Sequence, residues 1–245
     1  EKALALLNLP REVGLHPDGT VLPLERLTHL SPDQTAAARH LRDLLDHYVA
    51  GAAGGEAERR KAAFDRMTLE IAFTALNRLA ALRLCEERGL VVECVRKGTA
   101  SDGFQMFERI SGGALGGRFE TYRVFLECMF DELAVDLGVL FDRNTPQSAI
   151  FPSERCIEDV LAELNKADLA HLWTEDETIG WIYQYFNPPE ERRAMRDASQ
   201  APRNSRELAV RNQFFTPRYV VEFLTDNTLG RIWYEMRKGD TALRD

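Results

Sequence analysis

The chain has 245 residues, of which 44% are hydrophobic and 29% are charged, and its formal net charge is −8. This composition predicts one large or two small globular units and excludes a disordered tail. The acidic balance argues against a protein that coats nucleic acid over its whole surface. No apolar run approaches the ~20 residues of a membrane helix, and the start lacks the pattern of a signal peptide, so we expect a cytoplasmic protein.

Cysteines and histidines give no sign of a metal site or a disulfide framework. No Cys-x-x-Cys occurs, so we expect reduced and mostly buried thiols at the four scattered cysteines: Cys85, Cys94, Cys128 and Cys156. His40 and His47 stand seven apart without a third ligand at helical spacing, which favours surface histidines.

The first ninety residues are organised around two predicted helices. Closely spaced prolines and glycines in residues 1–30 predict an arm that lies on a neighbouring surface. Ser31 followed by a proline predicts the start of the first helix, and a glycine-rich connector follows it at 51–55. Residues 56–88 predict a long core helix that Gly89 ends, with Arg78 and Arg83 on its solvated side.

Residues 90–118 are predicted to contain no helix. The β-branched content of residues 90–95 indicates a short strand. Residues 97–118 are typical of a loop, and their glycines resemble a phosphate-binding loop only in part, because Ser111 stands where the first glycine of Gly-x-Gly-x-x-Gly is needed. We therefore expect a mobile surface loop here.

Three further helices are predicted between residues 119 and 186. The first covers 119–138, and Ser153 is expected to cap the second. Thr174 and Glu177 have the spacing of a capping box, which predicts that the third helix opens there. That helix is apolar on nearly all sides, so we expect it to be packed between neighbours.

Residues 187–190 read Asn-Pro-Pro-Glu. Asn-Pro-Pro followed by Tyr or Phe is the catalytic tetrapeptide of amino-methylating DNA methyltransferases, in which the aromatic ring stacks on a flipped base. Glu190 cannot stack. The four residues also suit a helix start, with Asn187 as the cap, Pro188 at the first position and Glu190 at the third, and this is our prediction.

An arginine-bearing segment follows. Residues 188–218 contain seven arginines and four acids, a local charge of +3, which leaves −11 for the rest of the chain. The pattern indicates two short helices with a break at Ala201 and Pro202, the second opened by Ser205. The segment is either a solvated face or a ridge that contacts DNA phosphates, and the candidate DNA-binding residues are Arg192, Arg193, Arg196, Arg203, Arg206 and Arg211.

The most informative stretch is residues 212–224. Thr216 is predicted to cap a helix with Pro217 at its first position. Apolar residues on one face follow, and helical character continues from 227 to 238, where Gly239 ends it. The string Gln-Phe-Phe-Thr-Pro that opens this helix resembles the Phe-x-Thr-Pro element, motif X, of DNA adenine methyltransferases of the type I restriction and phage-defence kind.

The resemblance extends to both sides of this string. Residues 179–186, the arginine-bearing segment, residues 213–217 and residues 227–233 together resemble the series that precedes the cofactor loop in the adenine methyltransferases of BREX-type and DISARM-type phage-defence systems. The family also resembles type II gamma-class adenine methylases. The match is good over about 174–233 and looser before it.

The resemblance implies methyl transfer from S-adenosylmethionine to the exocyclic amine of adenine in double-stranded DNA, with other proteins of the defence system as partners. It places Phe215, Thr216 and Pro217 against the methionine part of the cofactor, with Gln213 and Phe214 framing the loop. It assigns no catalytic residue, because the family's glycine-rich Asp-Pro-x-Cys-Gly-x-Gly loop and an aromatic Asn-Pro-Pro motif do not occur in this chain. We therefore expect a cofactor pocket completed beyond Asp245, no metal, and no methyl transfer by this chain alone.

The sequence thus predicts a mainly α chain, a multi-helical N-terminal domain that leads into the first helix of a Rossmann-like methyltransferase domain. We expect an arm and first helix at 1–55, a helical domain at 56–186, an arginine-bearing connector at 187–211 and the start of the methyltransferase domain at 212–245. The alternative is a stand-alone helical adaptor that binds proteins and no cofactor, which the acidic charge outside the arginine segment favours.

Overall fold

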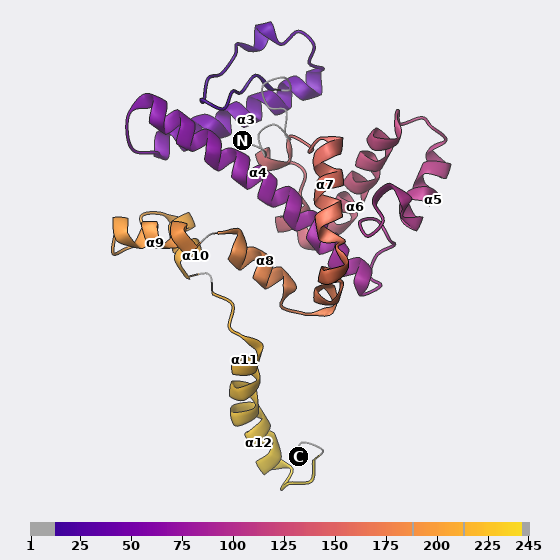
Figure 1. Cartoon of the computed structure of the whole chain (residues 1–245), viewed down its shortest axis with the longest axis vertical. Coiled ribbons are helices and arrows are strands. Elements are labelled where there is room, and N and C mark those ends of the chain that lie inside the picture. Colours follow the sequence, from indigo (N-terminus) through magenta and orange to yellow (C-terminus); the bar gives the residue numbers. More distant parts are fainter. Residues whose placement is uncertain (1–12, 188, 213, 242–245) are drawn as a thin grey trace. The chain divides into compact units, whose positions relative to one another are not determined.

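The computed structural model describes residues 13–187, 189–212 and 214–241 and shows a mainly α protein (Figure 1). These residues contain no sheet strand, and their one isolated β-bridge joins Leu15 to Val21. The chain divides into two compact units, Glu1–Thr174 and Glu175–Asp245. The mainly α fold predicted from the sequence is confirmed, whereas the division into four segments stays a prediction.

The first unit consists of α-helices joined by short 3₁₀ turns. In chain order its elements are η1 (Leu24–Arg26), α3 (Pro32–Gly51), α4 (Glu56–Glu87), η2 (Gly98–Ala100), α5 (Asp102–Ser111), α6 (Arg118–Phe141), η3 (Pro146–Ser148), α7 (Glu154–Leu164) and η4 (Ala167–Thr174).

Helices α3 and α4 pack on each other around one apolar cluster that includes Leu41, Leu45 and Phe64. The N-terminal arm completes this cluster with Val13 and Leu15, so its predicted place on a neighbouring surface is confirmed for the described residues. The predicted start of α3 and the predicted end of α4 are confirmed too. Ser31 and Gln34 form a capping box at the start of α3, and Gly89, with φ of +66°, follows the end of α4.

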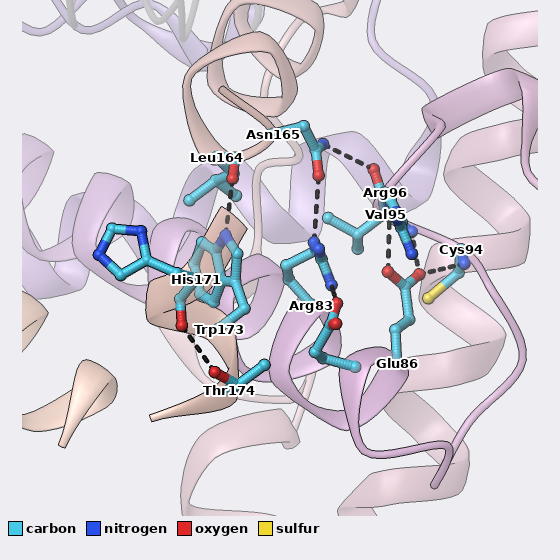
Figure 2. Close-up of polar contacts among 11 residues, drawn as sticks. Arg83, Glu86, Cys94, Val95, Arg96, Leu164, Asn165, His171, Trp173 and Thr174 are labelled. Atoms are coloured by element: carbon cyan, nitrogen blue, oxygen red, sulfur yellow. Dashed lines mark hydrogen bonds and ion pairs between the residues drawn. The ribbon is translucent and has the colours of Figure 1, made fainter. Parts of the chain in front are cut away.

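The predicted strand at residues 90–95 is wrong. These residues form bends without regular secondary structure, and the Glu86 carboxylate at the end of α4 accepts hydrogen bonds from the backbone N–H groups of Cys94, Val95 and Arg96 (Figure 2). A strand needs a partner strand for its N–H groups, and here one side chain supplies the acceptors instead.

The predicted loop at residues 97–118 is wrong over most of its length. Helix α5 occupies residues 102–111, and Phe104 from this helix is fully buried against Tyr122 and Phe125 of α6. Only the glycine-rich stretch between α5 and α6 remains irregular. Burial of an aromatic face against α6 stabilises a helix that the short, glycine-flanked sequence did not indicate.

Arg78 and Arg83 are buried, which corrects the prediction that they lie on the solvated side of α4. The Arg78 guanidinium donates to the carbonyls of Leu140 and Asp142 at 2.8 and 2.9 Å, and burial lowers its pKa. Arg83 and its neighbours are visible in Figure 2, where Nε donates to Asn165 Oδ1 at 3.1 Å. These arginines tie α4 to elements more than sixty residues away, because buried guanidinium groups require acceptors.

Helix α6 and the start of α7 match their predictions in position. Helix α6 is longer than expected at both ends and has a kink at Leu137. Ser153 is the residue before α7, as predicted, but its side chain makes no capping hydrogen bond.

The second unit is a series of short helices. These are α8 (Thr178–Phe186), α9 (Pro189–Ala198), α10 (Ser205–Asn212), α11 (Arg218–Thr225), the π-helical turn η5 (Asp226–Gly230) and α12 (Arg231–Met236). The two helices predicted for the arginine-bearing segment are α9 and α10, and the second begins at Ser205 as expected. Helices α11 and α12 follow one another through η5 in one line (Figure 1).

Two predicted caps in this region are wrong. Thr174 belongs to η4, where its hydroxyl donates to the His171 carbonyl at 2.7 Å, and α8 begins only at Thr178 (Figure 2). Asn187 ends α8 instead of opening the next helix, which begins at Pro189. Thr174 is instead engaged by a hydrogen bond within η4, and Asn187 belongs to the end of the preceding helix. Pro188 lies outside the described residues.

The cysteines are free thiols, and only Cys94 is buried, so the prediction of mostly buried thiols is wrong for the other three. Burial raises the pKa of the Cys94 thiol. His40 and His47 lie exposed on α3, as predicted. In the described part of the chain, no helix is long and apolar enough to cross a membrane, and no cluster of three or more metal-binding side chains occurs.

Candidate functional site

The candidate site is the stretch between α10 and α11. Residues 214–217 are all exposed, and Phe214 and Phe215 are 59% and 41% accessible to solvent. Gln213, the fifth predicted cofactor-binding residue, lies outside the described residues. We refer to residues 214–217 as the Phe-Phe-Thr-Pro segment.

The segment leads into α11, which begins at Arg218, one residue later than the predicted helix start at Pro217. Pro217 is the N-cap residue, in an extended conformation with ψ of 143°, and no side chain caps the helix. The Pro217 carbonyl accepts from the N–H groups of Val220 and Val221 at 3.0 and 3.3 Å. The prediction of Thr216 as a capping side chain is therefore wrong, because the proline remains outside the helix and its carbonyl begins the hydrogen-bond ladder.

Helix α8 holds Phe215. The Phe215 N–H donates to Gln184 Oε1 at 2.9 Å. One helical turn earlier, the Phe215 ring lies so close to Gly180 that a Cβ on this glycine would stand 2.6 Å from the ring. Gly180 and Gln184 share one face of α8 because they are four residues apart.

Helix α9 holds Phe214. The guanidinium carbons of Arg192 and Arg196 lie 5.2 and 5.8 Å from the centre of the Phe214 ring, within cation–π range. Arg196 Nη2 also donates to the carbonyl of Arg211 at 3.0 Å, which links α9 to the end of α10. These partners of Phe214 and Phe215 were not predicted. For the partners of Phe215, the only sequence signal is a glycine and a glutamine four residues apart in a mostly apolar helix, and the partners of Phe214 were predicted only as DNA-binding arginines.

Two other predicted DNA-binding arginines also make internal contacts. Arg203 donates to the buried Glu207 carboxylate through both its side chain and its backbone N–H, and these hydrogen bonds lower the pKa of Glu207. Arg211 is buried and donates to the Gln200 carbonyl at 2.9 Å. The arginines of residues 189–212 therefore also hold α9 and α10 together within the second unit.

Among the predicted DNA-binding arginines, Arg193 is the best candidate for a contact with DNA. Its side chain is exposed on α9, and it makes no hydrogen bond or ion pair with the described residues. The side chain of Arg206 lies outside the described part.

Residues 187–190 do not form an aromatic base-stacking site in the described structure. Asn187 is buried at the end of α8, and Glu190 is exposed in the first turn of α9. The stretch thus joins the end of α8 to the first turn of α9, although Asn187 is not the helix-opening cap that the sequence predicted.

The apolar face predicted beyond Pro217 is present but has no cover within the described residues. Large apolar side chains along residues 218–236 are between 42% and 72% exposed: Tyr219, Val221, Phe223, Leu224, Leu229, Ile232, Trp233, Tyr234 and Met236. Arg218 at its start contacts Glu222 at 2.9 Å, and this hydrogen bond raises the pKa of Arg218.

Comparison with known proteins gives two partial matches. One is "Adenine-specific methyltransferase PglX" of Lacticaseibacillus casei (strain Zhang), 37% identical over 57 residues, 23% of this chain. The other is "Adenine-specific methyltransferase BrxX" of Escherichia coli O9:H4 (strain HS), 29% identical over 73 residues, 30% of this chain. The chain is thus similar in part to adenine-specific methyltransferases. The matches cover 4% and 6% of these relatives' own lengths. No protein-family model and no solved structure matches the chain.

Proposed function

We propose that this chain is part of a DNA adenine methyltransferase of the phage-defence kind, and that its Phe-Phe-Thr-Pro segment forms one wall of the S-adenosylmethionine pocket. The observation that carries the proposal is the exposed segment at the start of α11, in a chain that is similar in part to two adenine-specific methyltransferases. The remaining walls of the pocket would come from residues beyond those in this chain.

The chemistry of the segment suits the cofactor. The backbone N–H groups at the start of α11 suit the carboxylate of the methionine part. The Phe215 ring, packed against Gly180 on α8 and still 41% exposed, offers an aromatic surface to the sulfonium cation. Thr216 and Pro217 stand between these two features in the sequence, and the resemblance implies that they also lie against the methionine part of the cofactor.

DNA is the proposed macromolecular substrate. Transfer to adenine requires the enzyme to hold DNA beside the pocket, and the arginine-bearing segment immediately precedes it in the chain. Because several of these arginines also have internal partners, we propose that the exposed Arg193 meets a phosphate most directly, with Arg192 and Arg196 beside it. The helical adaptor remains the alternative, and binding of neither cofactor nor DNA would favour it.

Binding of S-adenosylmethionine by the full-length protein tests the proposal. Equilibrium dialysis with labelled cofactor should show saturable binding that Phe215→Ala weakens by about 10-fold or more, because the variant removes the aromatic wall. Phe107→Ala, which removes a half-buried phenylalanine from α5 in the first unit, is the matched control and should bind as the wild type does. Absence of cofactor binding by the wild-type protein would overturn the proposal.

The isolated 245-residue chain provides a second measurement. With labelled S-adenosylmethionine and duplex DNA it should transfer no methyl group, because it lacks the glycine-rich loop and the aromatic Asn-Pro-Pro motif. Turnover by this chain would show that its active site is complete and that our assignment of the missing motifs is mistaken.

A further inference from the structure

We propose that Gln184 and Gly180 on α8 are positioning residues for the cofactor-binding segment. This inference rests on the proposed function and names the elements that set its pocket wall. Gln184 and Phe215 are 31 residues apart in sequence, yet the Phe215 N–H donates to Gln184 Oε1 at 2.9 Å. The residue that carries the aromatic wall is therefore fixed through its backbone by a side chain from another helix.

Gly180 provides the second point of contact. Because Gly180 has no side chain, the Phe215 ring can lie directly against its Cα. An added Cβ would lie 2.6 and 2.9 Å from two ring carbons. A separation under 3 Å cannot be accommodated without movement of the ring or the helix. The glycine is therefore required by the close approach of Phe215, and not by the backbone conformation, which is helical.

Together the two contacts define the orientation of Phe215. Gln184 fixes the direction of the backbone N–H, and Gly180 fixes the place of the ring, one turn apart on the same face of α8. On the other side of the peptide bond, Arg192 and Arg196 of α9 flank Phe214. The segment is thus held at two successive residues before Thr216 and Pro217 lead into α11.

The consequence for binding is preorganisation. A segment whose backbone is already fixed loses less conformational freedom when the cofactor binds, and this saving appears as affinity for the cofactor. Loss of the Gln184 contact should therefore weaken S-adenosylmethionine binding while leaving the affinity for DNA and the overall stability nearly unchanged.

The test uses Gln184→Leu and Gln184→Glu in the full-length protein. Leu has a similar size but no acceptor, so the KM for S-adenosylmethionine should rise by about 10-fold, the size expected for one hydrogen bond. Glu keeps an acceptor oxygen at the same place and should restore the KM to within about 2-fold of the wild type. The KM for DNA and the melting temperature should stay as in the wild type.

Gln105→Leu is the matched control, because the Gln105 amide donates to the Ala100 carbonyl at 2.8 Å in the first unit, and its loss should leave the cofactor KM unchanged. Gly180→Ala is a second variant that acts through the ring. It should raise the cofactor KM when Phe215 is present and have no further effect in a Phe215→Ala background, where the space is open.

The outcomes separate the inference from the proposed function. If the wild-type protein binds no S-adenosylmethionine, the proposed function fails. If it binds and Gln184→Leu binds equally well, the positioning role is overturned. The role is overturned too if Gln184→Glu gives no rescue, or if the melting temperature and the KM for DNA change together with the cofactor KM, because that pattern indicates general destabilisation.

Discussion

At Glu86, one carboxylate organises the connection between α4 and α5. It accepts hydrogen bonds from three successive backbone N–H groups (Figure 2). A single side chain therefore satisfies the donors of a stretch that has no regular secondary structure. Cys94 and Val95 are buried beneath it. The stretch leads directly into η2 and α5.

Glu86→Ala should lower the free energy of unfolding of the first unit by about 3 kcal/mol, because it leaves buried N–H groups without acceptors. Glu86→Gln keeps a neutral acceptor and should cost less. Chemical denaturation followed by circular dichroism measures both. The control is Glu163→Ala, which removes an exposed pair with Lys166 and should change stability by less than about 1 kcal/mol. Equal losses for Glu86→Ala and Glu163→Ala would contradict this account.

Among the elements, α5 shows how tertiary packing stabilises a short helix. It has ten residues between two irregular stretches, a length that is marginal for an isolated helix. Packing of Phe104 stabilises the helix. This residue is fully buried, and its ring lies edge to face with the Tyr122 ring, with 5.1 Å between the ring centroids. Ile110 on the same helix is 78% exposed.

Phe104→Ala should destabilise the first unit by about 3–5 kcal/mol, because it opens a cavity among aromatic rings. Ile110→Ala is the matched control on the same helix and should change the free energy of unfolding by no more than about 0.5 kcal/mol. Thermal and denaturant unfolding of the two variants gives the comparison. Similar effects of both substitutions would mean that α5 does not depend on its buried face.

In the whole molecule, charge is distributed unevenly. Residues 188–218 carry a formal charge of +3 in a chain whose net charge is −8, so any attraction to DNA must be local. Part of this positive charge also serves the structure of the second unit, as the contacts of Arg196 and Arg203 demonstrate. A phosphate contact is therefore best tested at an arginine without such a role.

Arg193→Ala in the full-length protein should reduce the slope of log affinity for duplex DNA against log salt by about 1, because one phosphate contact releases about one counterion. Arg155→Ala, an exposed arginine on α7, should leave the slope unchanged. Affinity measured at several salt concentrations provides the test. A wild-type slope in Arg193→Ala would exclude Arg193 from the DNA interface.

The sequence by itself determined the elements whose signals are local. The helix start at Ser31, the apolar periodicity of the core helix α4 and its end at Gly89 depend on neighbours within one or two turns, and each is present as predicted. The Phe-Phe-Thr-Pro string is also a local signal, and the sequence alone marks it as the candidate site.

Only the tertiary structure decided which side chains form hydrogen bonds with residues far away in the sequence. The burial of Arg78 depends on carbonyls 62 and 64 residues away, and the place of Phe215 depends on Gln184, 31 residues earlier. Helix α5 and the turn before it likewise depend on α6 and Glu86. The reason is that a charged or amide side chain has the same sequence pattern whether it faces water or a buried acceptor, and the folded neighbours alone distinguish the two.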